Sequence, residues 1–298
     1  MPTPIRYGVA ACAAAILAFG LGVRGQSAAL VLVGVNVIPM DRERVLEKQT
    51  LVIRDGRIAE MGATGTLKPP AGAQVVNGSG KYVMPALAEM HGHLAGANAA
   101  LNERILALNV VHGVLTVRSM QGHPDQLTLR DRVARGEIVG PRIYTSGPSA
   151  NGQSAATPAA GEKMARDQKA AGYDLIKIHP GVPRDAFDAL ARTAREVGIP
   201  FAGHVPAAVG VEHAIASGYR SIDHLDGYAE AALRDGATIG AGGSGFFGSA
   251  IAQSLDDGRI AGLVQKTKAA GVWVVPTETL MLNFLSSEPI EALMARPE

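Results

Sequence analysis

The chain has 298 residues, of which 47% are hydrophobic and only 4% aromatic, and it contains 36 glycines and a single cysteine. This length accommodates one large α/β domain, or one such domain with a small additional unit. The formal net charge is +1 at pH 7 and no basic patch is interleaved with aromatic residues, so we expect no nucleic-acid partner.

Residues 1–28 differ in composition from the rest of the chain. Arg6 is followed by an uncharged apolar run from Tyr7 to Val23, and small residues come after it. This order is typical of a signal peptide, so we predict an exported protein, periplasmic or secreted, that meets a membrane only through this segment. An uncleaved anchor helix is the alternative. Cleavage would remove Cys12, the only cysteine, so a metal site would have to use His, Asp, Glu or a modified Lys.

Residues 29–82 show short apolar runs and tight turns, with no helical pattern. The Asp55-Gly56 pair is a strong signal for a two-residue hairpin turn. The pattern predicts a small N-terminal β-sandwich element. Four or five strands are few for an independent core, so we expect strands from elsewhere to complete it. The apolar runs lie at 29–33, 35–40, 50–54, 57–62 and 74–77.

From residue 83 onward, helical segments end in glycine and short β-branched runs follow them. Glycine just after the last helical residue is a signal for a helix C-terminus. A series of helix–Gly–strand junctions predicts βα units and a parallel sheet. The junction glycines are Gly113, Gly172, Gly198, Gly218 and Gly271. The predicted helices include residues 100–111, 126–135, 161–171 and 184–197.

Residues 83–298 contain about seven predicted strands, including the opening run at 83–93 and a run at 142–145. No Gly-x-Gly-x-x-Gly follows the first strand, which argues against a dinucleotide-binding, doubly wound sheet. The series therefore predicts an α/β fold with a (β/α)8 TIM-like barrel. Because a complete barrel takes about 250 residues, we expect it to be incomplete and truncated at its C-terminal end.

Functional groups of (β/α)8 barrels lie at the C-terminal ends of the strands. The opening strand ends in His91 and His93, which lie on one strand face and can hold a metal ion from one side. A loop cap would explain any one strand-end histidine equally well. Their recurrence in several strands favours a metal site. The later strands end in Lys177, His179, His204 and His224.

Lys177 lies between Ile176 and Ile178 in a predicted barrel strand, so desolvation should lower its pKa. A neutral amine can react with carbon dioxide to give a carbamate, an anion whose two oxygens can bridge two metal ions. The alternative is a lysine that extends its amine to solvent from the strand end. His179 shares the face of Lys177 and is a candidate substrate-binding residue. Tyr228 is a second candidate substrate-binding residue, and packing is its alternative role.

The ordered motifs resemble those of the metal-dependent amidohydrolase superfamily, specifically its imidazolonepropionase-related, prolidase-like branch. The matching segments are residues 55–58, 84–93, 176–178, 203–205 and 222–228. The resemblance implies two divalent metal ions, usually zinc. His91 and His93 would hold one ion. His204 and His224 would hold the other, and a carboxylated Lys177 would bridge the two.

The resemblance implies hydrolysis of C–N amide bonds in dipeptides or N-acyl amino acids by a hydroxide that the two metals share. A cyclic amide or a lactone is an alternative substrate. The family's catalytic Asp ends the eighth strand, and no strand ending in Asp follows residue 277. We therefore interpret the chain as the front part of a longer enzyme and expect it to be inactive or to fold poorly alone. A barrel that binds metal without catalysis is an alternative function. A homo-oligomer is an open alternative for the assembly.

Overall fold

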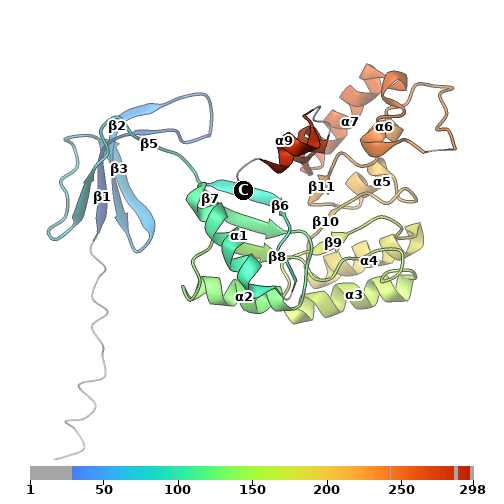
Figure 1. The fold of residues 1–298 in the computed structure, drawn as a ribbon, viewed down its shortest axis with the longest axis horizontal. Helices are drawn as coiled ribbons and strands as arrows, with labels where there is room; N and C mark the ends of the chain where they lie inside the picture. Colours follow the sequence, from blue (N-terminus) through green and yellow to red (C-terminus); the bar gives the residue numbers. More distant parts are fainter. Residues whose placement is uncertain (1–28, 97, 242, 285–287, 296–298) are drawn as a thin grey trace, which may run out of the picture. The chain divides into compact units, whose positions relative to one another are not determined.

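The computed structural model describes residues 29–96, 98–241, 243–284 and 288–295 (Figure 1). The predicted signal peptide at 1–28 lies outside the described residues. Among the described helices, none combines the length and the apolar character needed to cross a membrane. The chain divides into two compact units between Pro85 and Ala86, just after the predicted boundary at residue 82.

The first unit forms a single sheet. Its strands are β1 (Leu30–Val37), β2 (Leu46–Arg54), β3 (Arg57–Ala63), β4 (Gln74–Asn77) and β5 (Tyr82–Val83). The strand order is β3-β2-β1-β4, and β5 also pairs with β1. Asp55 and Gly56 have φ of 50° and 71°, as the predicted hairpin turn requires. A second layer is not found among the described residues of this unit, so the sandwich stays a prediction.

The second unit contains two parallel sheets whose strands follow the chain order (Figure 1). One sheet has the order β6-β7-β8 and the other β12-β11-β10-β9. Parallel bridges from Ser146 to Leu175 and from Ala150 to Ile178 connect β8 to β9. The strands are β6 (Leu87–Gly92), β7 (Val114–Ser119), β8 (Arg142–Thr145), β9 (Ile176–Ile178), β10 (Phe201–Gly203), β11 (Ser221–Asp223) and β12 (Trp273–Val275). The predicted parallel α/β class is confirmed. Barrel closure stays a prediction, because β6 and β12 are edge strands in the described part.

The helices alternate with these strands and begin at recognisable caps. Asn98, Thr157 and Asp256 each accept a hydrogen bond from a backbone N–H in the first turn of the helix that follows. The long helices are α1 (Ala99–Val111), α2 (Asp125–Ala134), α3 (Pro158–Ala171), α4 (Arg184–Val197) and α7 (Asp257–Ala269). The short ones are α5 (Val211–Ala216), α6 (Tyr228–Ala231), α8 (Glu278–Phe284), α9 (Ile290–Met294), and the 3-10 turns η1 (Phe246–Gly248) and η2 (Ala252–Ser254).

The main apolar core lies between the second sheet and its helices. Ile176, Phe201 and Ile222 point from β9, β10 and β11 into the same cluster as Phe187 and Leu190 of α4. The helices α3 and α4 pack side by side along this sheet (Figure 1). Because successive strand residues face opposite sides, the neighbours of these apolar residues face away from the helices. The interior side of the strands is therefore free to carry polar groups.

Gly203, at the end of β10, leaves room for the side chain of Lys177 on the neighbouring strand. A Cβ at position 203 would lie 2.8 Å from Lys177 Cδ and 2.4 Å from the carbonyl oxygen of Ile178. The φ of Gly203 is +127°, which side chains rarely adopt. A residue without a side chain therefore occupies the end of β10 next to Lys177.

A glycine at the end of α3 and a glycine inside α7 test whether the junction glycines are needed for their backbone conformation. Gly172 ends α3 with φ of +86° and nothing near its absent Cβ, so Gly172→Ala should cost about 1–2 kcal/mol through backbone strain alone. Gly262, inside α7, also has open space but lacks a positive φ, and Gly262→Ala should stabilise by about 0.5–1 kcal/mol. Urea unfolding measures both free energies. Effects of the same sign would contradict this account of the junctions.

Candidate functional site

The carboxyl ends of four strands in the second unit bring a group of histidines together. His91 comes from β6, His204 follows β10, and His224 follows β11. The ring centroids of His91 and His224 are 4.5 Å apart, and those of His204 and His224 are 4.7 Å apart. His93 lies 5.1 Å from His91, and His179, after β9, lies 5.1 Å from His204. The predicted site histidines therefore form one continuous cluster.

A buried carboxylate, Asp223 of β11, stands at the centre of this cluster. Its Oδ2 accepts a hydrogen bond of 2.8 Å from Lys177 Nζ and lies 2.9 Å from His91 Nδ1. Its Oδ1 is 3.7 Å from Arg118 Nη2. Lys177 and Asp223 are both 0% exposed. His91 of β6 thus reaches Asp223 of β11 although four strands lie between them in the order, so the array of strands must curve around this carboxylate.

Sequence reasoning missed the roles of Asp223 and Arg118. Asp223 was part of a recognised segment but received no function, because only the last polar residue of each strand was considered. Its inward position follows from the two-residue strand period, which places the core residue Ile222 on the opposite face. Arg118 has a comparable signal, a lone cation between Val117 and Ser119 in a buried stretch of β7.

Tyr228, the other predicted substrate-binding residue, has a different setting. Its hydroxyl shares a hydrogen bond of 2.7 Å with Thr267 Oγ1 of α7. The side chain packs against the main apolar core. Its polar atom is therefore engaged in joining α6 to α7, and contact with a substrate stays a prediction.

The electrostatics follow from burial of opposite charges in contact. Burial lowers the pKa of Lys177 below its usual 10.5, while the negative charge of Asp223 acts in the opposite direction. Burial by itself would raise the pKa of Asp223, but the contact with His91 and the charge and hydrogen bond of Lys177 lower it to about 2. The direction for Lys177 agrees with the sequence-based expectation. Carboxylation of its amine needs the neutral form, which this desolvation favours.

A hydrogen-bond partner determines which nitrogen His204 exposes. His204 Nδ1 lies 2.6 Å from Asp226 Oδ2, and an ionised carboxylate only accepts hydrogen bonds, so Nδ1 carries the proton. The lone pair of His204 is then on Nε2, as in histidines that bind a metal while a carboxylate holds the other nitrogen. His91 Nδ1 lies 2.9 Å from Asp223 Oδ2 as an ion pair and makes no hydrogen bond with the described residues.

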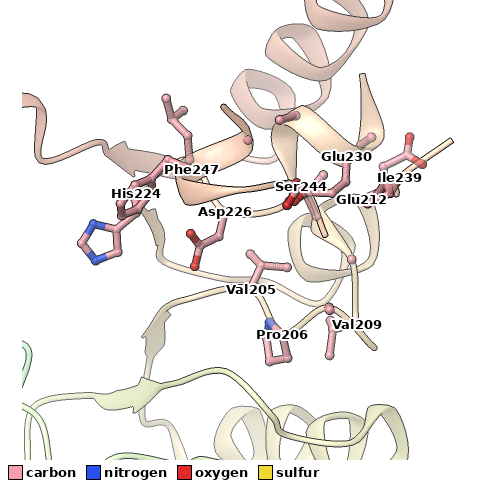
Figure 2. Close-up of a pocket in the computed structure, with 18 of the residues that line it drawn as sticks. Val205, Pro206, Val209, Glu212, His224, Asp226, Glu230, Ile239, Ser244 and Phe247 are labelled. Carbon is pink, nitrogen blue, oxygen red and sulfur yellow. The ribbon is translucent and has the colours of Figure 1, made fainter. Parts of the chain in front are cut away.

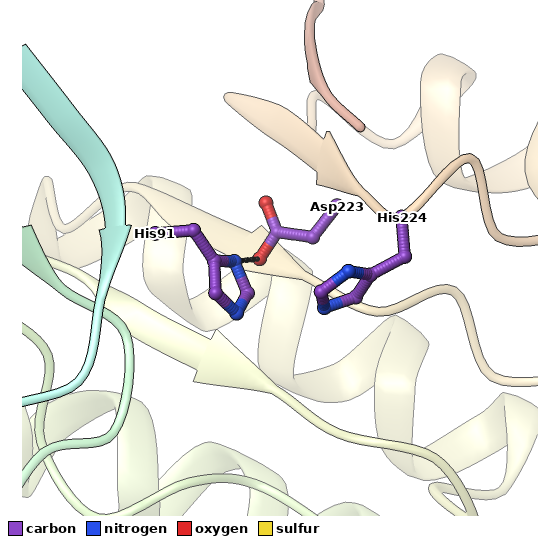
Figure 3. Close-up of side chains that lie close together, drawn as sticks. All are labelled: His91, Asp223 and His224. Carbon is purple, nitrogen blue, oxygen red and sulfur yellow. Dashed lines mark ion pairs between the residues drawn. The ribbon is translucent and has the colours of Figure 1, made fainter. Parts of the chain in front are cut away.

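The donor set fits a divalent cation. His91, Asp223 and His224 offer ligand atoms that all lie within 4.8 Å of one another (Figure 3). Asp223 Oδ1 accepts no hydrogen bond from the described residues, and a buried carboxylate oxygen in that state requires a partner. Imidazole nitrogens with a carboxylate oxygen are the ligands of many zinc sites. The second set, around His204, adjoins the first through His224.

A cavity of about 810 Å³ adjoins the cluster. The loops that follow β10 and β11 form its walls, together with residues of the 239–248 segment. His224 and Asp226 lie on one side of it, and Glu212 and Ile239 lie on the other (Figure 2). Its volume is that of a small-molecule site. The cavity can therefore present a small molecule or a short peptide to His224, the member of the cluster that lines it.

Comparison with known proteins shows what this arrangement is similar to. A scan against models of protein families finds no match. An enamidase from Eubacterium barkeri is 29% identical over 82 residues, which are 27% of this chain and 21% of the enamidase. The solved bottromycin amidohydrolase superposes with a TM-score of 0.57 at 25% identity, over 83% of this chain and 51% of that one. A Xaa-Pro dipeptidase with methionine bound in its active site gives a TM-score of 0.62 at 17% identity, over 84% and 67%.

The chain thus spans about a fifth of the enamidase and 51% and 67% of the two solved structures. The structural likeness covers most of this chain, and at 17% identity it shows the fold alone.

The Lys177–Asp223 pair should be strongly coupled in the metal-free protein. Removing one buried partner leaves the other charge uncompensated, so Asp223→Asn should cost about 3–5 kcal/mol. Lys177→Met should then cost less in the Asp223→Asn background than in the wild type. Urea unfolding of the four proteins gives the coupling energy. The exposed pair Arg166–Glu196, 3.1 Å apart, is the control and should couple by less than about 1 kcal/mol. Additive effects within about 0.5 kcal/mol at 177 and 223 would refute the coupling.

Stability of the metal-free protein should fall in mild acid. Burial lowers the pKa of the imidazoles of His179 and His224 from 6.5 to about 4. Neighbouring Lys177 adds to the shift at His179, and His91 adds to it at His224. Below pH 6.5 the unfolded chain binds more protons than the folded one, so the free energy of unfolding decreases from pH 6.5 to about 4. Urea unfolding across this range measures the slope. His179→Gln should make it shallower, and an unchanged slope would count against the assignment.

Proposed function

We propose that the chain is a member of the amidohydrolase superfamily and that it hydrolyses C–N amide bonds in small substrates such as dipeptides or N-acyl amino acids. This is the reaction class of the prolidase-like branch. One observation carries the proposal. The buried set of His91, Asp223 and His224 lies at the carboxyl ends of the strands, and the cavity of about 810 Å³ adjoins it.

In this proposal the chain would hold two divalent metal ions, most simply zinc. His91 and His93 would hold one ion, His204 and His224 would hold the other, and a carboxylated Lys177 would contribute to both. Asp223 would add a carboxylate to the set of His91 and His224. When bound, such ions supply Lewis acidity toward a carbonyl group and lower the pKa of water toward neutrality.

The chain's own residues orient this site and shape the substrate cavity. Asp226 holds the Nδ1 proton of His204, which fixes the direction of the Nε2 lone pair. Asp223 lies 2.9 Å from His91 Nδ1 and, while Lys177 is unmodified, accepts a hydrogen bond from its amine. Val205 and Val209 give one wall of the cavity an apolar surface, which favours an apolar substrate group and excludes water. We also propose that the protein is exported, on the composition of residues 1–28.

A second candidate function is metal binding without catalysis. It rests on the donor set of His91, Asp223 and His224, whose ligand atoms all lie within 4.8 Å of one another. Metal binding alone needs only the set of histidines and Asp223. The two candidates therefore share the metal site and differ in the chemistry that follows.

Metal-dependent release of an amine tests the main proposal. The full-length protein is assayed with zinc against a panel of dipeptides and N-acyl amino acids. We expect amide hydrolysis that chelation abolishes and added zinc restores. His224→Asn should lower its rate by more than about 100-fold, beyond the usual effect of an outer-shell change.

His112→Asn is the matched control, since His112 caps α1 and bonds Leu108 there. It should leave the rate unchanged. Hydrolysis that persists without metal, or that survives His224→Asn, would exclude the proposed site. Stoichiometric zinc binding without any amide hydrolysis would favour the non-catalytic candidate.

A further inference from the structure

His224 is held by a residue that sequence reasoning did not connect with the site. Its Nδ1 lies 2.8 Å from Oγ1 of Thr277, which follows β12. The backbone N–H of His224 also donates to the carbonyl oxygen of Val275, at 3.0 Å. The end of β12 thus holds His224 through both its main chain and its imidazole.

Thr277 Oγ1 also lies 2.6 Å from the carbonyl oxygen of Pro276, a group that can only accept a hydrogen bond. A threonine hydroxyl has a single proton, so one arrangement satisfies all three groups. In it the hydroxyl donates to Pro276 and accepts from His224 Nδ1, which leaves the Nε2 lone pair free. His204 has the same arrangement with the carboxylate of Asp226 as its acceptor.

The backbone at both ends of this hydrogen bond is strained. Thr277 has φ of 55°, a conformation that β-branched residues rarely adopt. His224 and Leu225 have φ of 58° and 59°. Strained residues of this kind persist where the surroundings over-determine them, and they concentrate at functional sites. A relaxed backbone at these residues would not be expected to keep the hydroxyl and the imidazole in this contact.

We propose that Thr277 is a positioning residue, which fixes His224 in the Nδ1-protonated tautomer and presents Nε2 as a ligand to a divalent cation. The inference rests on the metal centre of the proposed function but not on amide hydrolysis. Its tests therefore measure the tautomer and the metal affinity, which are independent of turnover.

Two variants separate the hydroxyl from the shape of the side chain. Thr277→Val keeps the β-branch but removes the acceptor, so the affinity of the metal-free full-length protein for zinc should fall about 10–100-fold. Thr277→Ser keeps the hydroxyl and should bind zinc as tightly as the wild type. Competition with a chelator of known affinity measures the zinc affinity.

Nuclear magnetic resonance of the ring nitrogens in the metal-free protein gives the tautomer directly. His224 should be protonated on Nδ1 in the wild type and in Thr277→Ser, and should shift toward the Nε2-protonated form in Thr277→Val. The His224→Asn variant identifies its signals. Thr267→Val is the control for a purely structural effect, since Thr267 bonds Tyr228 and is buried outside the cluster. It should change neither the tautomer nor the zinc affinity.

Wild-type zinc affinity and an unchanged tautomer in Thr277→Val would overturn the proposal. Equal losses in Thr277→Ser and Thr277→Val would also overturn it, because they would assign the effect to the β-branched shape. If the affinity pattern holds while no variant and no wild-type protein cleaves amides, the positioning role stands and the hydrolase function alone fails.

Discussion

The second unit depends on one buried carboxylate. Asp223 is fully enclosed, and it meets Lys177, His91 and Arg118, which come from three other strands. Burial of an isolated charge costs several kcal/mol, so each of these cations or donors is needed to keep the carboxylate inside. Its contacts also bring residues of β6, β7, β9 and β11 together at one point in the interior of the second unit. The curvature of the strand array and the geometry of the histidines therefore have the same cause.

This arrangement forms because the two faces of each strand carry different kinds of side chain. Ile176 and Ile222 pack outward against the helices, while Lys177 and Asp223, one residue further on, face inward. Two of the histidines have a hydrogen-bond partner suited to them, a carboxylate for His204 and a hydroxyl for His224, while His91 lies against the carboxylate of Asp223. A buried polar network whose protons are held in hydrogen bonds is rigid, and a metal site requires rigidly held ligands.

The sequence predicts the parts of this architecture that local rules determine. Glycines such as Gly172 end helices, and His91, His204 and His224 end strands, because both signals depend on near neighbours in the chain. It does not predict that the runs at 29–33 and 35–40 form one strand, which Gly34 allows with φ of 79°. Nor does it reveal contacts such as His224–Thr277 or Lys177–Asp223, since these depend on how distant strands register in space. The missed residues are those whose partners lie far along the chain.

The central claim is that the cluster around Asp223 is a divalent metal centre. Anomalous X-ray scattering from crystals of the zinc-loaded protein tests it most directly. The account predicts two anomalous peaks, one about 2.0–2.1 Å from a ring nitrogen of His91 and the other at the same distance from Nε2 of His224. Density confined to the surface, with the ion pair between Lys177 and Asp223 unchanged and no peak near His224, would contradict it.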